Sequence, residues 1–211
     1  MSLDNLLNDV ANIYEKYKDS NLVSNDEFNF VLDMFKDKQI NHNKMSNCRN
    51  VNIIITFMKK FQDDQNIQLS GNHMLGNIAS NNQDHIKKIT ELGGIELVIQ
   101  NMKKFQDNQD MQRFGNLMLG NISFDNEDNR KKINDLGGIG LVIQNMKKFQ
   151  DNQAIQKNGN HMLGNIAIDN EHNIKKITEL GGIELVIQNM KKFQDNQDIQ
   201  RFGNLMLGII A

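Results

Sequence analysis

The feature that most constrains this chain is a segment that recurs with a fixed period of 44 residues. The clearest copy runs from Gly93 to Ser123, and the first of the four copies is degenerate. A Gly-Gly pair marks the period at Gly93, Gly137 and Gly181. The string Met-Lys-Lys-Phe marks it at Met58, Met102, Met146 and Met190. A fixed period of about twenty to fifty residues is typical of solenoids, so we predict a repeat array.

Composition narrows the class of protein. The formal net charge is −2, so no global field draws the chain onto nucleic acid or an anionic membrane. The one cysteine, Cys48, argues against a disulfide framework and indicates a reducing compartment. The sequence shows neither a signal peptide nor an apolar run long enough to span a bilayer. We therefore expect a cytoplasmic protein without membrane insertion, with nuclear or cytoskeletal association as variants.

Residues 1–41 lie outside the repeat. Leu3, Leu6 and Leu7 begin an apolar pattern at helical spacing, which predicts a helix over about residues 3–18. Ser24 with Glu27 three residues later forms a capping box and starts a second helix. A solenoid needs a capping element over its apolar end, and we assign that role to these two helices.

The array is predicted to span residues 42–211 as about four units. Their boundaries are expected at 42–82, 83–126, 127–170 and 171–211. The third unit predicts helices over residues 127–136, 139–150 and 153–167, with glycine ending the first of them in a left-handed conformation. In the first unit, Arg49 and Asn50 replace the Gly-Gly pair. The predicted fold class is therefore an all-α solenoid of three-helix repeats with an N-terminal helical cap.

Glycines recur inside each third helix, where each costs up to about 1 kcal/mol relative to alanine. The first set is Gly71, Gly115, Gly159 and Gly203. The second set is Gly76, Gly120, Gly164 and Gly208. Repetition of an unfavourable residue indicates a use, and we expect close approach of neighbouring helix backbones.

Taken together, these features resemble the armadillo repeat family over about residues 42–211. The resemblance rests on the polar first helix, the Gly-Gly-Ile corner, the aliphatic second helix and the ending Leu-Gly-Asn-Ile-Ala, seen at Leu75–Ala79 and Leu163–Ala167. HEAT repeats are the alternative, but they have two-helix units and lack the corner. The resemblance implies a right-handed superhelix whose third helices line a concave groove for an extended peptide.

In that family an Asn near the end of the third helix holds the peptide backbone, and an aromatic residue, often Trp, lies one turn earlier. The matching Asn residues here are Asn77, Asn121 and Asn165, and Ile209 stands at the fourth position. One turn earlier the chain departs from the pattern, with His73, Leu117, His161 and Leu205.

The residues themselves also indicate a ligand groove. Positions i and i+4 share a helix face, so each Asn continues a stripe with the residues four and eight positions before it. A side-chain amide both donates and accepts hydrogen bonds, which suits the backbone of an extended ligand. Arg113, Lys157 and Arg201 add a basic rail to these stripes. We therefore expect a protein or peptide ligand that carries acidic residues.

Other uses of the same surface remain open at this stage. The Asn residues could bond to a neighbouring repeat and only hold the superhelix. The chain could instead bind through its loops or convex face, or act as a spacer or assembly subunit. Because the sequence stops inside the third helix of the fourth unit, we also expect either a longer array or docking through that end, including self-association into a homo-oligomer.

We find no sequence pattern that predicts catalysis, a cofactor or a metal site. No His/Cys cluster has zinc spacing, and no nucleophile elbow occurs. His73 and His161 are two repeats apart and cannot share a metal. Lys pairs such as Lys103-Lys104 recur, but neighbouring aspartates argue against a phosphate-binding ridge. We therefore predict neither an enzyme nor a nucleic-acid-binding protein.

Overall fold

The computed structural model describes residues 51–80 and 82–210. Every regular element in these ranges is an α-helix. The helices are α4 (Val51–Lys60), α5 (Gln65–Ile78), α6 (Gln83–Glu91), α7 (Gly94–Lys104), α8 (Gln109–Ser123), α9 (Glu127–Asp135), α10 (Gly138–Lys148), α11 (Gln153–Ala167), α12 (Glu171–Glu179), α13 (Gly182–Lys192) and α14 (Gln197–Ile210). The predicted cap at residues 1–41 and the altered turn at Arg49 and Asn50 lie outside the described residues.

The helices form repeating groups of three, as the period predicts. One group is α6 to α8, the next is α9 to α11, and the third is α12 to α14, with α4 and α5 before them. For the unit chosen above, the helices begin and end within two residues of the predicted bounds. The all-α solenoid of three-helix units is confirmed.

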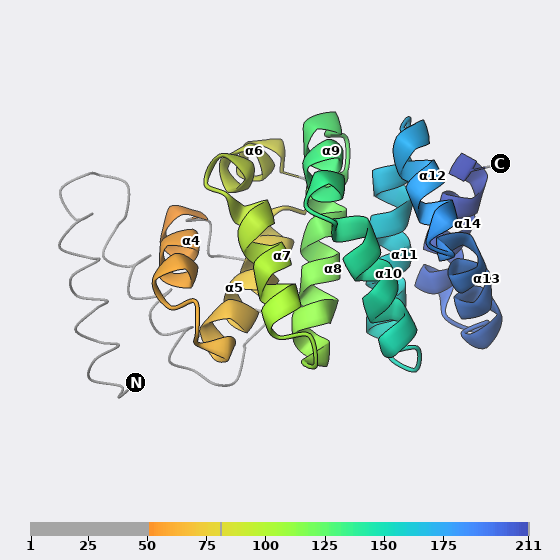
Figure 1. Cartoon of the computed structure of the whole chain (residues 1–211), viewed down its shortest axis with the longest axis horizontal. Helices are drawn as coiled ribbons and strands as arrows, with labels where there is room; N and C mark the ends of the chain where they lie inside the picture. Colours follow the sequence, from red (N-terminus) through yellow and green to blue (C-terminus); the bar gives the residue numbers. More distant parts are fainter. Residues whose placement is uncertain (1–50, 81, 211) are drawn as a thin grey trace.

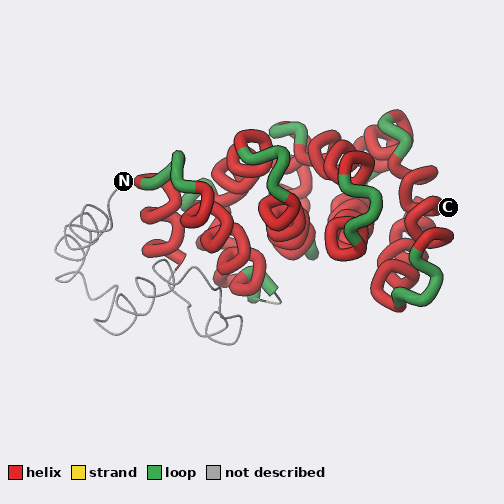
Figure 2. The backbone as a smooth tube through the Cα atoms, turned by 90° about the horizontal axis from the view of Figure 1, so that it is seen from below, coloured by secondary structure: helices red, strands yellow, loops and turns green. Residues whose placement is uncertain are grey.

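The units follow one another along the long axis of the molecule (Figures 1 and 2). The first helices α6, α9 and α12 lie along one edge, and α7 and α10 lie in front of α8 and α11 (Figure 1). Each third helix packs on the next, α5 on α8, α8 on α11 and α11 on α14. The third helices therefore form a continuous layer.

Polar residues set the helix ends. Asn126 begins α9, and its side chain accepts a hydrogen bond from the Asn129 backbone N–H. Asn152 begins α11 in the same way, by accepting from the Ala154 and Ile155 backbones. Side-chain caps of this kind satisfy N–H groups that have no partner within the helix. Gly137 has a φ of 79°, the left-handed conformation predicted for the corner between the first and second helices.

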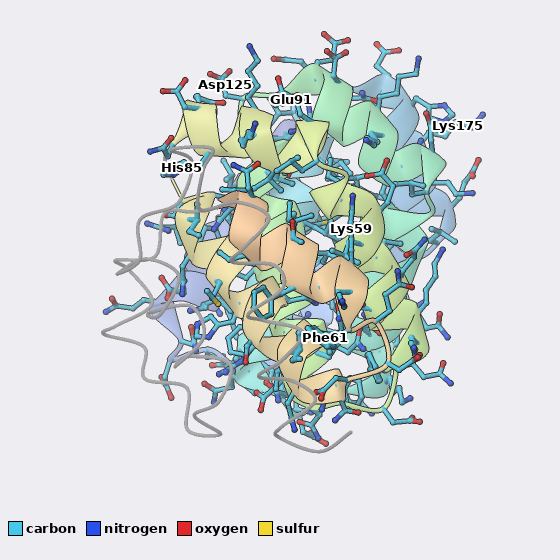
Figure 3. All side chains as sticks on the ribbon, turned by 90° about the vertical axis from the view of Figure 1, so that its left-hand side faces the viewer. Lys59, Phe61, His85, Glu91, Asp125 and Lys175 are labelled. Carbon is cyan, nitrogen blue, oxygen red and sulfur yellow. The ribbon has the colours of Figure 1, made fainter. Side chains whose placement is uncertain are left out.

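The core consists of aliphatic and methionine side chains from the second and third helices. Examples from one unit are Ile139, Val142, Met146, Ile155 and Met162, all nearly inaccessible to solvent. The first helices contribute much less to the core. In α9, for example, Ile133 is the one apolar side chain that is buried. Figure 3 shows His85, Glu91, Asp125 and Lys175 on this polar edge. Within the described ranges, no helix is both long enough and apolar enough to cross a membrane.

The two sets of helix glycines have different neighbours. A Cβ on Gly159 would come within 2.3 Å of the Met146 sulfur, a contact inside one repeat that recurs in the other units. A Cβ on Gly120 would come within 3.4 Å of the Met162 Cα in the next repeat. The expected close approach of backbones is thus borne out for the second set at Gly120. The first set instead makes room for a methionine side chain.

A glutamine links the last two helices of each unit, and Gln68 and Gln112 also accept a hydrogen bond from the next unit. Gln112 donates from Nε2 to the Met102 and Phe105 carbonyl oxygens, both at 3.0 Å. These carbonyls stand at the C-terminal end of α7, where a helix lacks its own donors. The Oε1 of Gln112 accepts a hydrogen bond from Asn145 Nδ2 of the following unit at 2.6 Å. The Gln and Asn of the repeat therefore form a polar connection through the core.

The recurring lysine pairs connect neighbouring units. Lys147 donates forward to the Leu180 carbonyl oxygen at 3.0 Å. Lys148 donates back to the Gln106 carbonyl oxygen at 3.2 Å and pairs with Asp107. Lys103 likewise donates forward to the Leu136 carbonyl oxygen, and Lys104 donates back to the Gln62 carbonyl oxygen. The pairs therefore have a structural role between repeats.

Candidate ligand-binding groove on the third helices

Two of the three predicted ladder residues form hydrogen bonds between repeats. Asn121 Nδ2 donates to the Gly76 carbonyl oxygen at 2.8 Å. Asn165 Nδ2 donates to the Gly120 carbonyl oxygen at 2.9 Å. Both carbonyls belong to the last turn of a third helix, where backbone acceptors have no helical donor. The Asn residues therefore tie successive third helices together, the structural role considered above.

This structural bond leaves part of each amide for a ligand. A carboxamide has two N–H groups and an oxygen with two lone pairs. Within the described part of the chain, no hydrogen bond uses the Oδ1 atom of Asn121 or Asn165, and both side chains line a cavity described below. At the next position, Ile209 has no amide, so no side chain in the described part donates to the Gly164 carbonyl oxygen.

His161 lies beside Asn165 and is held in place on two sides. Its Nε2 is 2.9 Å from Asn165 Nδ2, and its ring lies 4.5 Å from the Phe202 ring of the next repeat. Burial lowers the His161 pKa to about 4, with contributions from the positive charges of Arg201 and Lys157. The ring is therefore neutral near neutral pH, and Nε2 accepts the Asn165 hydrogen bond.

Other predicted site residues are engaged within the protein. His73 is buried and stacks on Phe114, with ring centroids 3.8 Å apart. Arg113 pairs with Asp110 at 3.3 Å and lies over the Phe114 ring. Leu117 packs against Gly76 of the preceding unit. A Cβ added to Gly76 would lie 3.5 Å from the Leu117 side chain.

Lys157 and Asn77 complete the predicted set. Lys157 lies 3.6 Å from the Asp198 carboxylate of the next unit. The side chain of Asn77 is exposed and forms no hydrogen bond with the described residues. The first rung of the predicted ladder is thus unlike the second and third, which support the neighbouring helix.

A cavity of about 590 Å³ opens between α8, α11 and α14 and extends to the start of α6. Its lining is Gln83, Ile86, Asn121, Phe124, His161, Asn165, Arg201, Phe202 and Leu205. Four predicted site residues meet here, namely Asn121, His161, Asn165 and Arg201. Five others, Asn77, His73, Leu117, Arg113 and Lys157, are not part of this lining.

Apart from Leu205, the apolar half of the cavity was not predicted. Phe202 follows Arg201 on the same helix, and Phe124 is the residue that ends α8. Ile86 and Gln83 come from the first helix of the second unit. The positions of these residues at the cavity depend on how the repeats stack. The i, i+4 argument considers one helix at a time and contains no information about stacking. The string Arg-Phe-Gly, present only in the second and fourth units, was the available signal.

The described residues contain no group of three His, Cys, Asp or Glu side chains positioned to bind a metal ion. The polar groups of the cavity are amides, one neutral imidazole and one guanidinium. Such groups bind by hydrogen bonding and charge pairing.

Designed armadillo repeat proteins are among the solved structures that are similar to this chain. A designed armadillo repeat protein, YIII(Dq)4CqI, superposes with a TM-score of 0.65 and 18% identity over 81% of this chain and 70% of its own. Another, YIII(Dq.V1)4CPAF, solved in complex with the peptide (KR)4, gives a TM-score of 0.63 and 15% identity over 84% of this chain and 72% of its own.

A third similar structure is an engineered protein of the Northeast Structural Genomics Consortium, with a TM-score of 0.66 and 23% identity. The match covers 80% of this chain and 65% of the engineered one, so the present chain spans about two thirds of its length. No protein-family model and no curated protein matches the sequence. These likenesses establish the fold, which is that of armadillo repeat proteins.

Proposed function

We propose that this protein is a binding module that holds an extended peptide or partner segment along its third helices. The observation that carries the proposal is the cavity in which Asn121, His161, Asn165 and Arg201 meet an apolar wall. The volume falls within the range of about 300 to 1,000 Å³ that is usual for ligand sites.

The amides explain why the ligand would be extended. The backbone of an extended segment has N–H and C=O groups that need partners when they leave water. The Oδ1 atoms of Asn121 and Asn165 can accept from such N–H groups while each Nδ2 atom keeps its bond to the preceding repeat. Because this contact is independent of ligand side chains, other groups must determine the sequence preference.

The designed relative solved with (KR)4 binds a basic peptide. The present cavity has Arg201 as the one formally charged side chain of its lining. A positive charge at this point repels a basic ligand. We therefore expect this protein to bind (KR)4 weakly, and that peptide serves as a negative control.

A second candidate function is assembly through another surface. The observation in its favour is Ile187 on α13, a large apolar side chain that is 36% exposed and outside the cavity. Under this alternative the array is a spacer, and partners bind away from the third helices.

Selection of phage-displayed random 16-residue peptides on the immobilised full chain tests both functions. Two matched variants each place a charge on an exposed apolar position, Leu205→Glu inside the cavity and Ile187→Glu outside it. Leu205 is 44% exposed, so both variants should fold, which circular dichroism would verify. We expect wild type and Ile187→Glu to enrich the same peptides, and Leu205→Glu to lose at least about tenfold in affinity for them, or about 1.4 kcal/mol.

The opposite pattern, with binding lost only in Ile187→Glu, would favour the assembly surface. If wild type enriches no peptide above background, peptide binding in this groove is wrong.

A further inference from the structure

We propose that the cavity selects for a bulky apolar ligand side chain with a carboxylate beside it, and that Arg201 binds this carboxylate. The inference rests on the proposed peptide-binding function and adds the chemistry of the ligand. It depends on how charges are paired in three successive repeats.

In the second unit, the arginine of the third helix is neutralised by an acid of the same helix. Arg113 Nη2 lies 3.3 Å from Asp110, three residues earlier. Carboxylates at this spacing lie on the same helix face and pair with the cation. Arg113 therefore has its own anion.

The fourth unit has the same two residue types at the same spacing, Asp198 and Arg201, yet the pair does not form. Asp198 instead lies 3.6 Å from Lys157 of the third unit. Lys157 has no acid of its own at that spacing, because Ala154 stands three residues before it. As a consequence, Arg201 has no carboxylate partner among the described residues.

Arg201 is nonetheless held toward the cavity. Its guanidinium lies over the Phe202 ring at 4.5 Å from the ring centroid. Stacking on an aromatic face leaves the planar edge of the guanidinium, with its N–H groups, available to a carboxylate. Phe202 is in turn fixed by the His161 ring of the neighbouring helix. The cation is thus both oriented and unneutralised.

No charge in the lining competes with Arg201 for an anion. The remaining lining residues are apolar or amides, apart from His161, whose pKa of about 4 keeps it uncharged near neutral pH. A carboxylate entering the cavity therefore encounters one positive charge and no negative one. The charge pattern fits an anionic ligand group.

The apolar part of the lining defines the second half of the ligand. Phe124 is 50% exposed and Leu205 is 44% exposed, which is unusual for large apolar side chains. Both face the same cavity, together with Ile86 and Phe202. Covering them with a bulky apolar side chain removes this surface from water, which is favourable. The ligand group beside Arg201 is therefore expected to be aromatic or a large aliphatic.

The test compares peptides selected from the phage-displayed random library on wild type, Arg201→Glu and Lys131→Glu. Lys131 is exposed on α9 outside the cavity, so its variant changes the net charge by the same amount. We expect wild type and Lys131→Glu to enrich peptides with a bulky apolar residue next to Asp or Glu. We expect Arg201→Glu to enrich Lys or Arg at that position instead.

The outcomes separate the two proposals. The assignment of Arg201 is overturned if the peptides enriched by wild type show no preference for Asp or Glu. It is also overturned if Arg201→Glu enriches acidic peptides as wild type does. In both cases peptide binding itself stands. If wild type enriches no peptide, the binding function itself fails and this inference fails with it. An affinity loss of at least about tenfold for the wild-type peptides in Arg201→Gln, with Lys131→Gln unchanged, would support the charge pairing independently.

Discussion

At the scale of single residues, the ladder asparagines combine a structural bond with a surface that a ligand can use. Asn165 is only 2% exposed, and its amide supports both the Gly120 carbonyl and the His161 ring. Asn77 occupies the same repeat position but is exposed and has no such bond among the described residues. Residues at equivalent positions of the repeat therefore contribute unequally to the stability of the fold.

We predict that Asn165→Ala lowers the free energy of unfolding by about 1–3 kcal/mol, because it removes the donor from the next repeat to the Gly120 carbonyl and to the His161 ring, leaving Ser123 Oγ as the side-chain donor to that carbonyl. Asn77→Ala should change it by less than about 0.5 kcal/mol. Urea unfolding followed by circular dichroism measures both. Equal losses in the two variants would show that the Asn165 bond does not support the array.

His161 makes the stability of the array depend on pH. Its folded pKa of about 4 is below the value of about 6.5 expected in the unfolded chain, so the unfolded state binds more protons between these values. The stabilisation is full above about pH 6.5 and decreases as the pH falls toward 4. The total change is roughly 3 kcal/mol.

We predict that His161→Leu, which installs the residue found at this position in the second and fourth units, reduces this pH dependence. The exposed His172 provides the control, and His172→Gln should keep the wild-type slope. Urea unfolding at neutral pH and at about pH 4.5 supplies the comparison. A wild-type slope that persists in His161→Leu would contradict the role given to this ring.

At the scale of helices, the sequence predicted most of the fold, because the period repeats the same signals in every unit. Glycine corners such as Gly137 and cap residues such as Asn152 stop and start helices by local chemistry, which a single sequence displays. The contacts between units could not be predicted in this way. The bond from Asn145 to Gln112 joins residues 33 positions apart, and its geometry depends on helix stacking.

The same distinction applies to the candidate site. The stripe argument placed Asn121, His161 and Asn165 on one helix layer, and in the structure all three line the same cavity because they occupy equivalent or adjacent turns of neighbouring third helices. It could not show that Arg113 is neutralised while Arg201 is not. In the fourth unit Asp198 pairs with Lys157 of the preceding unit, whereas Leu69 stands at the equivalent position before Asp110.

The buried glutamines provide a prediction about helix packing. Gln112→Ala would remove the partner of two carbonyls and of the Asn145 amide, so we expect a loss of roughly 3 kcal/mol or more. Gln200→Ala should cost less, because Gln200 is only half-buried and accepts no bond from a following unit within the described residues. The comparison uses urea midpoints of the two variants. A larger loss for Gln200→Ala would contradict this account.

At the scale of the whole molecule, the similar units of the described residues produce a surface that is not uniform. The third helices stack continuously, and Asn, Gln and Lys side chains link each unit to its neighbours. Small differences between units then decide where a ligand can bind. The His of the third unit and the Arg-Phe pair of the fourth form a cavity around Asn165. The near-identical sequence of the units thus builds the scaffold, and their departures from identity define the candidate site.

The most direct measurement is a methyl NMR titration of the full chain, labelled at isoleucine and leucine, with the most enriched selected peptide. The account predicts shifts centred on Leu205 and Ile86, which line the cavity, and little change at Ile187 on α13. Shifts centred on Ile187, with Leu205 and Ile86 unchanged, would contradict ligand binding along the third helices and move the binding surface to another face of the array.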